Sequence, residues 1–440
     1  MKRLAALCIS ILLLSALTAC GQAPGLLDPH DPVSLTMWHV YGEQADSPMN
    51  RLIDEFNATV GRERGVLVNV TLMTNSAEMG PRLLAAQQNI AGAGELPDLF
   101  FCHPSNAAAL GADQLLNWND WFSPEEQASF VDSFWQEGLV EGRLAVLPVS
   151  KSTHLLFVNG AQFQRFSADT GVTYGDLATW DGFFRTAEAY HAWSGGKPFC
   201  ALDFLLRAVE LNALSQGAPV SLEDGWYDFA DPALQAAWAP FARALVQGHI
   251  AVSDLYSNTQ VMTGEVAAGL GSSAAVLYYN DTVTYENNVS EPMLLAALPM
   301  PQAADGLPVA TQAGVGLSAS RTTEARAEAA SLFAHWLTEG ERNLDFVAST
   351  GYMPVRNASY EAIDDYPFAA DGYAAVYRTL KEVRNTCTSY TEPAFPNYYQ
   401  RVNALYAALR VQQQSWAARA ARGEALETLM QEAWDLFRSI

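Results

Sequence analysis

Apolar runs of strand length alternate with helix-like segments in the first part of the chain. Residues 33–40, 66–72 and 96–102 are runs of this kind. Ser47 is followed by proline and begins one predicted helix, because serine caps a helix and proline suits its first turn. A second helix is predicted over 81–90. Strands that alternate with helices predict a parallel, doubly wound sheet, which binds ligands at the carboxyl ends of its strands.

Helix-like and strand-like segments continue beyond this part, and residues 373–440 are mostly helical in pattern. Thr179 and Asp231 are cap residues that begin two predicted helices, and an amphipathic pattern predicts a long helix over 325–346. Short apolar runs predict strands over 294–300 and 311–317. No internal repeat or low-complexity run interrupts this order. The pattern therefore predicts an α/β protein throughout.

One stretch allows two interpretations. Residues 144–149 and 155–158 are apolar, and the segment 150–154 between them is polar and contains no glycine. The simpler interpretation is a surface turn between two strands. The alternative is a strand that leaves one core, crosses a wet cleft and enters a second core, because a polar segment costs free energy if it is buried unpaired. In that case Ser152 and Thr153 would line the cleft.

Length and charge narrow the class of protein. A chain of 440 residues is too long for one ordinary core, so two or three domains are expected. Half of the residues are hydrophobic, which is typical of globular proteins and not of disordered chains. The net charge of -23, from 25 basic and 48 acidic residues, argues against binding to nucleic acids or anionic membranes through surface charge.

The N-terminus has the pattern of an export signal. Two basic residues are followed by an apolar run over 4–17, too short to span a bilayer comfortably, and a Leu-Thr-Ala-Cys sequence ends at Cys20. This sequence resembles the lipobox of bacterial lipoproteins, which implies cleavage before Cys20 and lipidation of its sulfur. An ordinary signal peptide with a coincidental cysteine is the alternative. Residues 1–19 are thus a predicted signal peptide and 20–32 a predicted flexible tether, which leaves the mature protein lipid-anchored on the extracytoplasmic face of the cell membrane.

Other chemistry is weakly indicated. Cys102, Cys200 and Cys387 remain in the mature chain, which allows at most one intramolecular disulfide and has no zinc-type spacing. A G-x-G-x-x-A match at 269–274 does not clearly follow a strand and is attributed to chance. No hydrolase motif marks a pair of carboxylates, although an extracellular hydrolase stays possible.

Three histidines raise the alternative of metal capture. His39, His103 and His154 each lie at a predicted strand end or at the possible crossing, so their imidazoles could converge on zinc or manganese. Polar histidines without a metal are the preferred interpretation, and no cofactor is predicted.

Taken in order, a series of short motifs resembles the extracellular solute-binding proteins of ABC importers, specifically the large carbohydrate-binding, maltose-binding-like family. Each motif is weak alone, but their order and spacing extend over nearly the whole mature chain. The motifs are Trp38-His39, Leu96-Pro97-Asp98-Leu99, Leu147-Pro148, Ser152-Thr153, Phe157-Val158-Asn159, Ala178-Thr179-Trp180-Asp181, Gly264-Glu265-Val266-Ala267, Leu298-Pro299-Met300-Pro301 and Thr350-Gly351-Tyr352-Met353-Pro354-Val355.

The resemblance implies a two-lobe periplasmic-binding-protein fold, a hinged trap in which each lobe is a doubly wound sheet flanked by helices. Lobe 1 would hold residues 33–149 and 294–345, and lobe 2 would hold 150–293 and 346–440. The segment 150–154 would then be the first crossing between the lobes. The implied activity is capture of a small-molecule carbohydrate for the transmembrane subunits of an ABC permease, without catalysis. A monomer that binds no nucleic acid is expected.

The same resemblance implies a set of solute contacts. Sugars need hydrogen-bonding groups around flat aromatic rings. Alternatives are a core position for Trp38, a solvated charge for Glu78, simple helix capping for Ser272 and surface positions for the two late tyrosines. The predicted ligand-binding residues are Trp38, Tyr41, Glu78, Ser152, Ser272, Ser273, Gln312, Tyr398 and Tyr399.

The type of solute has two possibilities. The glycerol-phosphate-binding branch of the family shares several of these motifs and carries a late arginine suited to phosphate. Here the corresponding loop, 391–399, has Glu392 as its one charge, and the nearest basic side chain is Arg401. Removal of residues 1–19 loses two basic and no acidic residues, so the side-chain balance becomes 23 minus 48, about -25. A neutral mono- or oligosaccharide is therefore predicted, with a phosphorylated polyol as the alternative.

Overall fold

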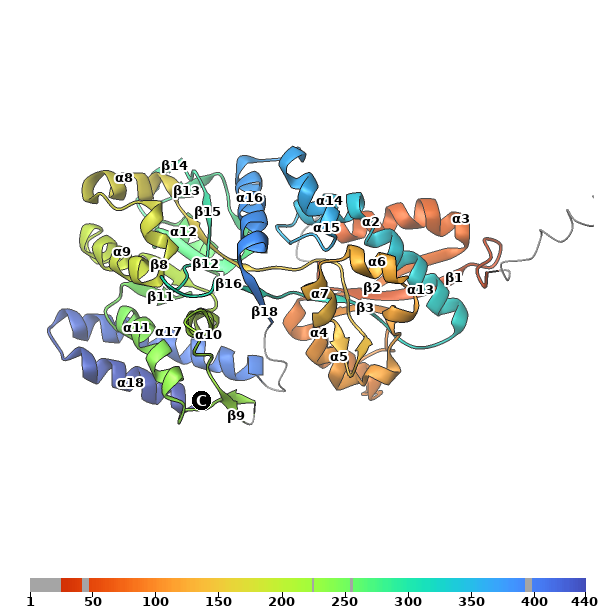
Figure 1. Cartoon of the computed structure of the whole chain (residues 1–440), viewed down its shortest axis with the longest axis horizontal. Coiled ribbons are helices and arrows are strands. Elements are labelled where there is room, and N and C mark those ends of the chain that lie inside the picture. Colours follow the sequence, from red (N-terminus) through yellow and green to blue (C-terminus); the bar gives the residue numbers. More distant parts are fainter. Residues whose placement is uncertain (1–24, 42–46, 224, 254–255, 392–397) are drawn as a thin grey trace, which may run out of the picture.

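The computed structural model describes residues 25–41, 47–223, 225–253, 256–391 and 398–440. It has two lobes, each with a central sheet and surrounding helices, arranged side by side along the long axis of the molecule (Figure 1). The predicted α/β fold class is confirmed. The predicted signal peptide and Cys20 lie outside the described residues.

The first sheet has the strand order β2-β1-β3-β17-β6. Its three sequential strands, β1 (Val33–His39), β2 (Val66–Met73) and β3 (Leu99–Cys102), are parallel, as the alternating pattern predicted. Two strands from later in the chain extend it: β17 (Gly316–Ala319) pairs antiparallel with β3, and β6 (Leu147–Pro148) pairs antiparallel with β17, so β6 has the same direction as the first three strands.

Helices of varied length flank this sheet. The predicted helix start at Ser47 is confirmed, because the Ser47 hydroxyl accepts a hydrogen bond from the backbone N–H of Asn50. The helix predicted over 81–90 begins earlier, at Ser76, where the Asn75 side chain caps it. The helices are α2 (Pro48–Phe56), α3 (Arg62–Arg64), α4 (Ser76–Gln87), α5 (Pro104–Leu110), α6 (Pro124–Ser129), α7 (Asp132–Glu137), α13 (Glu324–Leu337), α14 (Gly340–Ala348) and α15 (Asn357–Ala362).

The second sheet has the strand order β11-β8-β12-β7-β15. The strands β8 (Cys200–Leu202), β11 (Ile250–Val252) and β12 (Ala268–Ser272) are parallel, so their carboxyl ends lie at one edge. The strand β7 (His154–Val158) runs antiparallel to β12 and to β15 (Ala296–Pro299).

Helices also surround the second sheet, and most of them have eleven or more residues. The starts predicted at Thr179 and Asp231 are confirmed, because both side chains accept a backbone N–H at the first helical turn. The helices are α8 (Gly160–Thr170), α9 (Trp180–Trp193), α10 (Leu205–Ser215), α11 (Pro232–Val246), α12 (Ser257–Met262), α16 (Asp371–Thr386), α17 (Tyr398–Ala421) and α18 (Leu426–Arg438).

The two lobes differ from the predicted division at two places. The strand β15 pairs with β7 in the second sheet, although the segment 294–345 was predicted to return to lobe 1. The helix α15 follows residue 346 but packs beside α14, and Phe130 bridges to Arg356 just before it, so this part lies with the first lobe. The predicted lobe boundaries came from motif resemblance. The pairing of β15 with β7 depends on contacts between distant segments, which motif resemblance does not report.

Two predicted elements are divided. The helix predicted over 325–346 is two helices, α13 and α14, because the side chain of Glu339 accepts hydrogen bonds from the N–H groups of Glu341 and Arg342 and begins a new helix. The strand predicted over 311–317 becomes β16 (Val309–Gln312) and β17. The break between them contains Gly314, whose φ of 107° strongly favours glycine.

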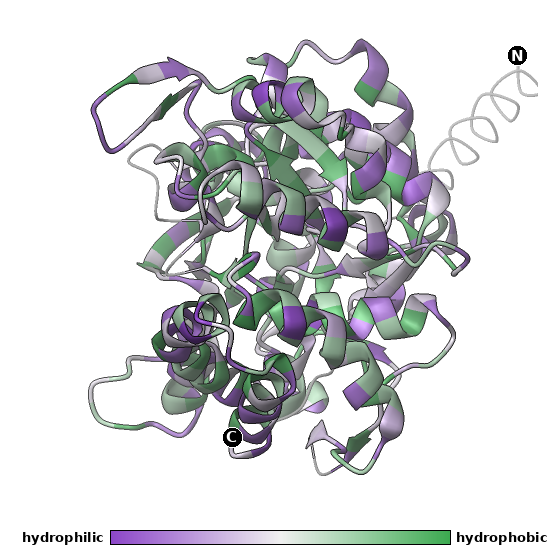
Figure 2. Ribbon diagram, turned by 90° about the vertical axis from the view of Figure 1, so that its left-hand side faces the viewer, coloured by the Kyte–Doolittle hydropathy of each residue, from purple (hydrophilic) through white to green (hydrophobic). Residues whose placement is uncertain are grey.

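Hydrophobic side chains form separate cores, a large one beside the first sheet and another beside the second. Figure 2 shows hydrophobic residues concentrated in the inner strands and hydrophilic residues on outward helix faces. The largest fully buried side chains include Trp118 beside the first sheet and Trp238 and Trp416 in the second lobe. Among the described residues, every helix is too short or too polar to span a bilayer.

Candidate functional site

The polar segment 150–154 joins the two sheets. It follows β6 of the first sheet and leads into β7 of the second, so the structure agrees with a crossing and not with a surface turn. Residues 149–153 are called the first crossing segment here. Ser152 and Ala313 exchange both backbone hydrogen bonds, of 2.9 and 3.0 Å, and Ala313 belongs to the second connection, between β16 and β17. Gly314 makes this close approach possible, because a Cβ there would lie 3.2 Å from the Ser150 carbonyl oxygen.

A buried ion pair fixes the first crossing segment to the first lobe. Lys151 Nζ lies 2.8 Å from Glu137 Oε2 at the end of α7, and the two side chains are 4% and 5% exposed. Lys151 also donates to the carbonyl of Gly314 at 3.2 Å. Gln312, a predicted ligand residue, is buried beside this pair and donates to Glu137 and to the carbonyl of Ser133. Its amide nitrogen is thus held by α7.

The end of β1 also meets the first crossing segment. Tyr41 Oη forms a 2.6 Å hydrogen bond with Ser150 Oγ, and the Tyr41 ring makes edge contacts with Phe101 and Phe346. Burial raises the pKa of Tyr41 well above its usual range. Tyr41 therefore supports the crossing from inside the first lobe. Its predicted contact with solute stays a prediction.

Trp38 and Glu78 lie in contrasting surroundings. Trp38 packs in a small core with Met79 and Phe100 and is 6% exposed, which corresponds to the alternative of a core tryptophan. Glu78 is exposed in the first turn of α4, where a hydrogen bond from Thr74 lowers the pKa of its carboxyl, with a further contribution from Arg82. Solute contacts by both side chains stay predictions.

The carboxyl edge of the second sheet carries aromatic side chains that the sequence reasoning missed. Phe204 follows β8 and is half-buried, Tyr256 follows β11 and is 64% exposed, and Tyr278 follows β12 and is 45% exposed. His154, at the crossing, stacks on the Phe204 ring with centroids 4.2 Å apart. The signal was present in the sequence, because each ring follows a short apolar run.

Asp203 lies at the same edge and was also missed. Its carboxylate accepts hydrogen bonds from the backbone and hydroxyl of Ser257, of 2.7 and 2.9 Å. Burial raises the pKa of Asp203 to about 6, and hydrogen bonds from Ser253 and Ser257 oppose that shift. Gly271 is close enough that a Cβ would lie 2.5 Å from this carboxylate. Asp203 directly follows the apolar run 199–202, so the sequence did contain a signal for a polar group at a strand end.

The predicted serines lie together at the crossing. The N–H of Ser273 donates to the carbonyl of Thr153 at 2.8 Å, which joins the end of β12 to the first crossing segment. Ser272 accepts from the backbone of Ala274 at 3.3 Å and so caps the following helical turn. The hydroxyl of Ser273 is buried and has no hydrogen-bond partner in the part of the chain that the structure describes. Ser152, at 6% exposed, completes the group.

Tyr398 belongs to a buried polar cluster in the second lobe. Its hydroxyl lies 3.1 Å from Glu210 Oε1 and 3.1 Å from the hydroxyl of Tyr227. Glu210 in turn pairs with Arg207, whose guanidinium lies 5.1 Å from the centre of the Tyr390 ring. The ring of Tyr398 is 3% exposed and is therefore part of the lobe interior. The side chain of Tyr399 lies outside the described residues.

Arg401, the basic residue that follows the loop 391–399 in the sequence, is engaged elsewhere. Arg401 lies 4.3 Å above the centre of the Trp226 ring and donates to the carbonyl of Ile440 at 3.2 Å.

The three histidines have partners other than a metal ion. His39 Nε2 bonds Asn50 Oδ1 at 2.8 Å, and its other ring nitrogen accepts from the backbone of Tyr41. His103 is the residue that caps the start of α5, and its backbone N–H donates to Asn106 Oδ1 at 3.2 Å. Within the described ranges, no group of three His, Cys, Asp or Glu side chains could hold a metal ion. Cys102, Cys200 and Cys387 are free thiols.

The arrangement was compared with known proteins. A family model for the bacterial extracellular solute-binding proteins matches residues 51–375. No curated protein sequence matches the chain significantly.

Solved structures give a consistent fold. A cyclic α-maltosyl-1,6-maltose binding protein from Arthrobacter globiformis is 17% identical, with a TM-score of 0.66 and coverage of 93% of this chain and 100% of that chain. Lmo0181 from Listeria monocytogenes, in complex with cycloalternan, is 14% identical, with a TM-score of 0.67 and coverage of 93% and 99%. UgpB from Mycobacterium tuberculosis, in complex with glycerophosphocholine, is 19% identical, with a TM-score of 0.65 and coverage of 92% and 98%.

Proposed function

Since the chain belongs to the bacterial extracellular solute-binding proteins, we propose that it captures a neutral mono- or oligosaccharide and delivers it to the permease of an ABC importer. Membership of this family implies an extracytoplasmic location. The proposed site lies where the carboxyl edges of both sheets meet the first crossing segment.

The observation that carries the carbohydrate proposal is the set of aromatic rings at one sheet edge. Phe204 follows β8 directly, Tyr256 lies in the segment after β11, and Tyr278 ends the helical turn that follows β12, so all three come after the carboxyl ends of parallel strands, where α/β sheets bind ligands. Sugars present apolar C–H faces that stack on such rings and hydroxyls that need polar partners. Asp203 and Ser152 supply polar groups nearby.

Charge argues for a neutral solute. Arg207 is paired with Glu210, and Arg401 is held on Trp226, so neither presents a free cation for a phosphate. The predicted mature net charge of about -25 would also repel an anion. The alternative, a phosphorylated polyol, is supported by the resemblance in fold to a protein solved with glycerophosphocholine.

In this proposal, solute binding changes the equilibrium between an open and a closed arrangement of the two lobes. A solute that contacts both sheet edges has more contacts when the edges are close, so it shifts the population of the protein toward a closed form. The closed form would dock on the permease. In this mechanism the protein binds and releases its solute unchanged.

Changing Ser152 tests the position of the site. We expect Ser152→Ala to weaken carbohydrate binding by about 0.5–1.5 kcal/mol, because one hydrogen bond to solute is lost, with little effect on folding. Differential scanning fluorimetry against a panel of sugars, polyols and glycerophosphodiesters first identifies the solute through a raised melting temperature. Calorimetric titration then compares the variant with the wild type.

Ser123→Ala is the matched control, because it also removes a serine hydroxyl, but at the start of α6 and away from the proposed site. It removes a helix cap, so it should lower stability more than Ser152→Ala does and leave binding unchanged. Normal binding by Ser152→Ala to every stabilising ligand would contradict the proposed site. Tight binding of a glycerophosphodiester that weakens steeply with salt would favour the alternative solute, and chemically altered solute would contradict a binding role.

The lipid anchor is a separate prediction. We expect Cys20→Ala to release the protein from membranes, or to leave it as an unprocessed precursor, because the predicted lipid is attached to that sulfur. Membrane fractionation and the mass of the mature N-terminus measure this. Cys387→Ala is the control, since it removes a thiol from the folded part of the chain. Unchanged retention of Cys20→Ala on membranes would contradict a lipoprotein.

A further inference from the structure

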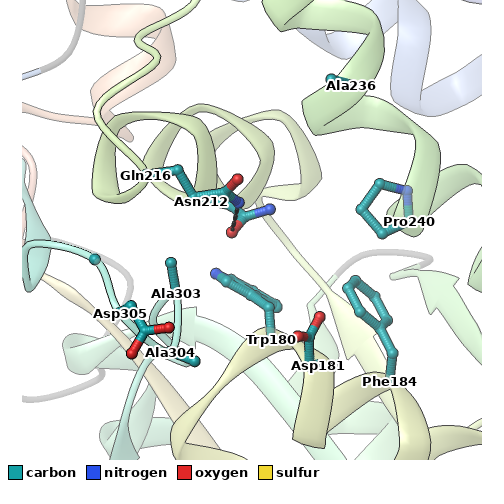
Figure 3. A pocket seen from close by; sticks show the side chains of 11 residues that line it. Trp180, Asp181, Phe184, Asn212, Gln216, Ala236, Pro240, Ala303, Ala304 and Asp305 are labelled. Atoms are coloured by element: carbon teal, nitrogen blue, oxygen red, sulfur yellow. Dashed lines mark hydrogen bonds between the residues drawn. The ribbon is translucent and has the colours of Figure 1, made fainter.

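The second lobe contains a pocket at a distance from the crossing. Its volume is 490 Å³, within the range of about 300–1,000 Å³ that small-molecule sites occupy. It lies between the start of α9, the last turn of α10, the middle of α11 and the loop 303–306 (Figure 3). The helix α10 begins at the carboxyl edge of the second sheet, and the pocket lies at its other end, about 15 Å away at 1.5 Å per residue. The pocket is therefore distinct from the site proposed above.

One buried donor in this pocket lacks a partner. Trp180 is 3% exposed, and its indole Nε1 forms no hydrogen bond with any described residue. Figure 3 shows this nitrogen directed toward the side of the pocket formed by Asn212 and Ala303. A buried N–H without an acceptor costs about 1–3 kcal/mol, so a ligand oxygen at this point would be stabilised.

Polar groups on both sides of the indole are suited to hydroxyls. Asn212 is 4% exposed, and its Oδ1 accepts from Gln216 Nε2 at 2.9 Å, which orients both amides at the wall. The carboxylates of Asp181 and Asp305 lie at the rim, and neither forms an ion pair with another described residue. Phe184 adds a flat apolar surface. Donors, acceptors and an aromatic face thus surround one volume.

The wall formed by the loop 303–306 is fixed before any ligand binds. Ser215, at the end of α10, donates through its hydroxyl to the carbonyl of Leu307 at 2.8 Å, and its own carbonyl accepts from the N–H of Leu307 at 2.8 Å. The backbone of Ala303 also donates to the Ser215 hydroxyl at 3.3 Å. A wall held in this way does not have to be ordered on binding, which lowers the entropic cost of ligand capture.

We propose that this pocket is a second binding site, for a small neutral polyhydroxy compound such as a monosaccharide or polyol. A hydroxyl can accept from Trp180 Nε1 and donate to Asp181 or Asp305, which neither a simple cation nor a simple anion can do. The lining contains no Lys, Arg or His and carries two carboxylates, so it repels anions. A cation could approach the carboxylates but would leave the indole N–H without an acceptor.

The indole N–H provides a direct probe. The protein is labelled with ¹⁵N at its tryptophan side chains, the Trp180 signal is assigned by its loss in Trp180→Phe, and D-glucose or glycerol is titrated against the whole chain. We expect a saturable shift of the Trp180 signal. In Asp305→Asn, at an exposed position, the apparent affinity should fall by about five- to tenfold, because the neutral amide oxygen is a weaker acceptor than the carboxylate.

Three controls make the outcome decisive. Asp54→Asn, at an exposed position on α2 in the first lobe, should leave the titration unchanged. Tetramethylammonium chloride and sodium acetate should produce no saturable shift, and such a shift with either would overturn the assigned ligand class. Ser152→Ala should also leave the titration unchanged. No saturable shift with glucose or glycerol, or loss of the shift in Ser152→Ala, would overturn the second site.

Discussion

Glu137→Met is expected to lower the free energy of unfolding by about 3–5 kcal/mol. The change removes the carboxylate that lies 2.8 Å from Lys151 Nζ, in a place where both side chains are at most 5% exposed. Among the described residues, the buried ammonium would then keep only the carbonyl of Gly314 as its partner. Urea denaturation, followed by tryptophan fluorescence, measures the loss.

A double variant separates the cost of an unpaired Lys151 from the cost of losing the Glu137–Lys151 ion pair as a whole. In Glu137→Met with Lys151→Met no unpaired charge is left, so most of the lost stability should return. Glu78→Gln is the matched control, because the Glu78–Arg82 pair is about half exposed and should contribute no more than about 1 kcal/mol. A loss below about 1 kcal/mol in Glu137→Met would show that water reaches Lys151 and would contradict the buried pair.

Asn343→Ala is expected to cost about 2–6 kcal/mol, since it leaves two buried backbone groups unsatisfied at about 1–3 kcal/mol each. The Asn343 amide donates to the carbonyl of Val149 at 2.7 Å and accepts from the N–H of Val355 at 3.1 Å. It therefore clamps the start of the first crossing segment to the chain that follows α14. The same denaturation experiment measures the effect.

Asn57→Ala is the matched control for this clamp. Asn57 also bonds the N–H and the carbonyl of one residue, Val68, both at 2.8 Å, but it is partly exposed, so water can replace those bonds. Its loss should cost clearly less than that of Asn343. Equal losses in the two variants would contradict the argument that burial decides the cost.

Local signals explain which parts of the fold the sequence could predict. Ser47, Thr179 and Asp231 mark helix starts through their own side chains, so these starts could be located without any tertiary contact. The break at Glu339 depends on a side chain that is uncommon as a cap, and the amphipathic pattern continued across it. The pairing of β15 with β7 depends on register between distant segments, which no local pattern encodes.

The candidate site was predictable to a similar extent. The crossing segment could be located because its polar residues interrupt two apolar runs. The strand-end rule would also have found Asp203 and Phe204, had it been applied after residues 199–202. The rotation of Tyr41 toward Ser150 and the burial of Gln312 against α7 depend on side-chain packing, and sequence spacing carries no information on either.

The hydrogen bonds at the crossing limit how the lobes can move. Ser152 exchanges both backbone bonds with Ala313, and Lys151 exchanges backbone bonds with Met353 on its other side. The two connecting segments are thus bonded to each other, and Met353 fastens the first of them to the first lobe, so a change in the angle between the sheets has to be shared by both connections. We therefore expect the lobes to have one principal degree of freedom, bending across this pair of segments, while independent twisting and sliding would break its bonds.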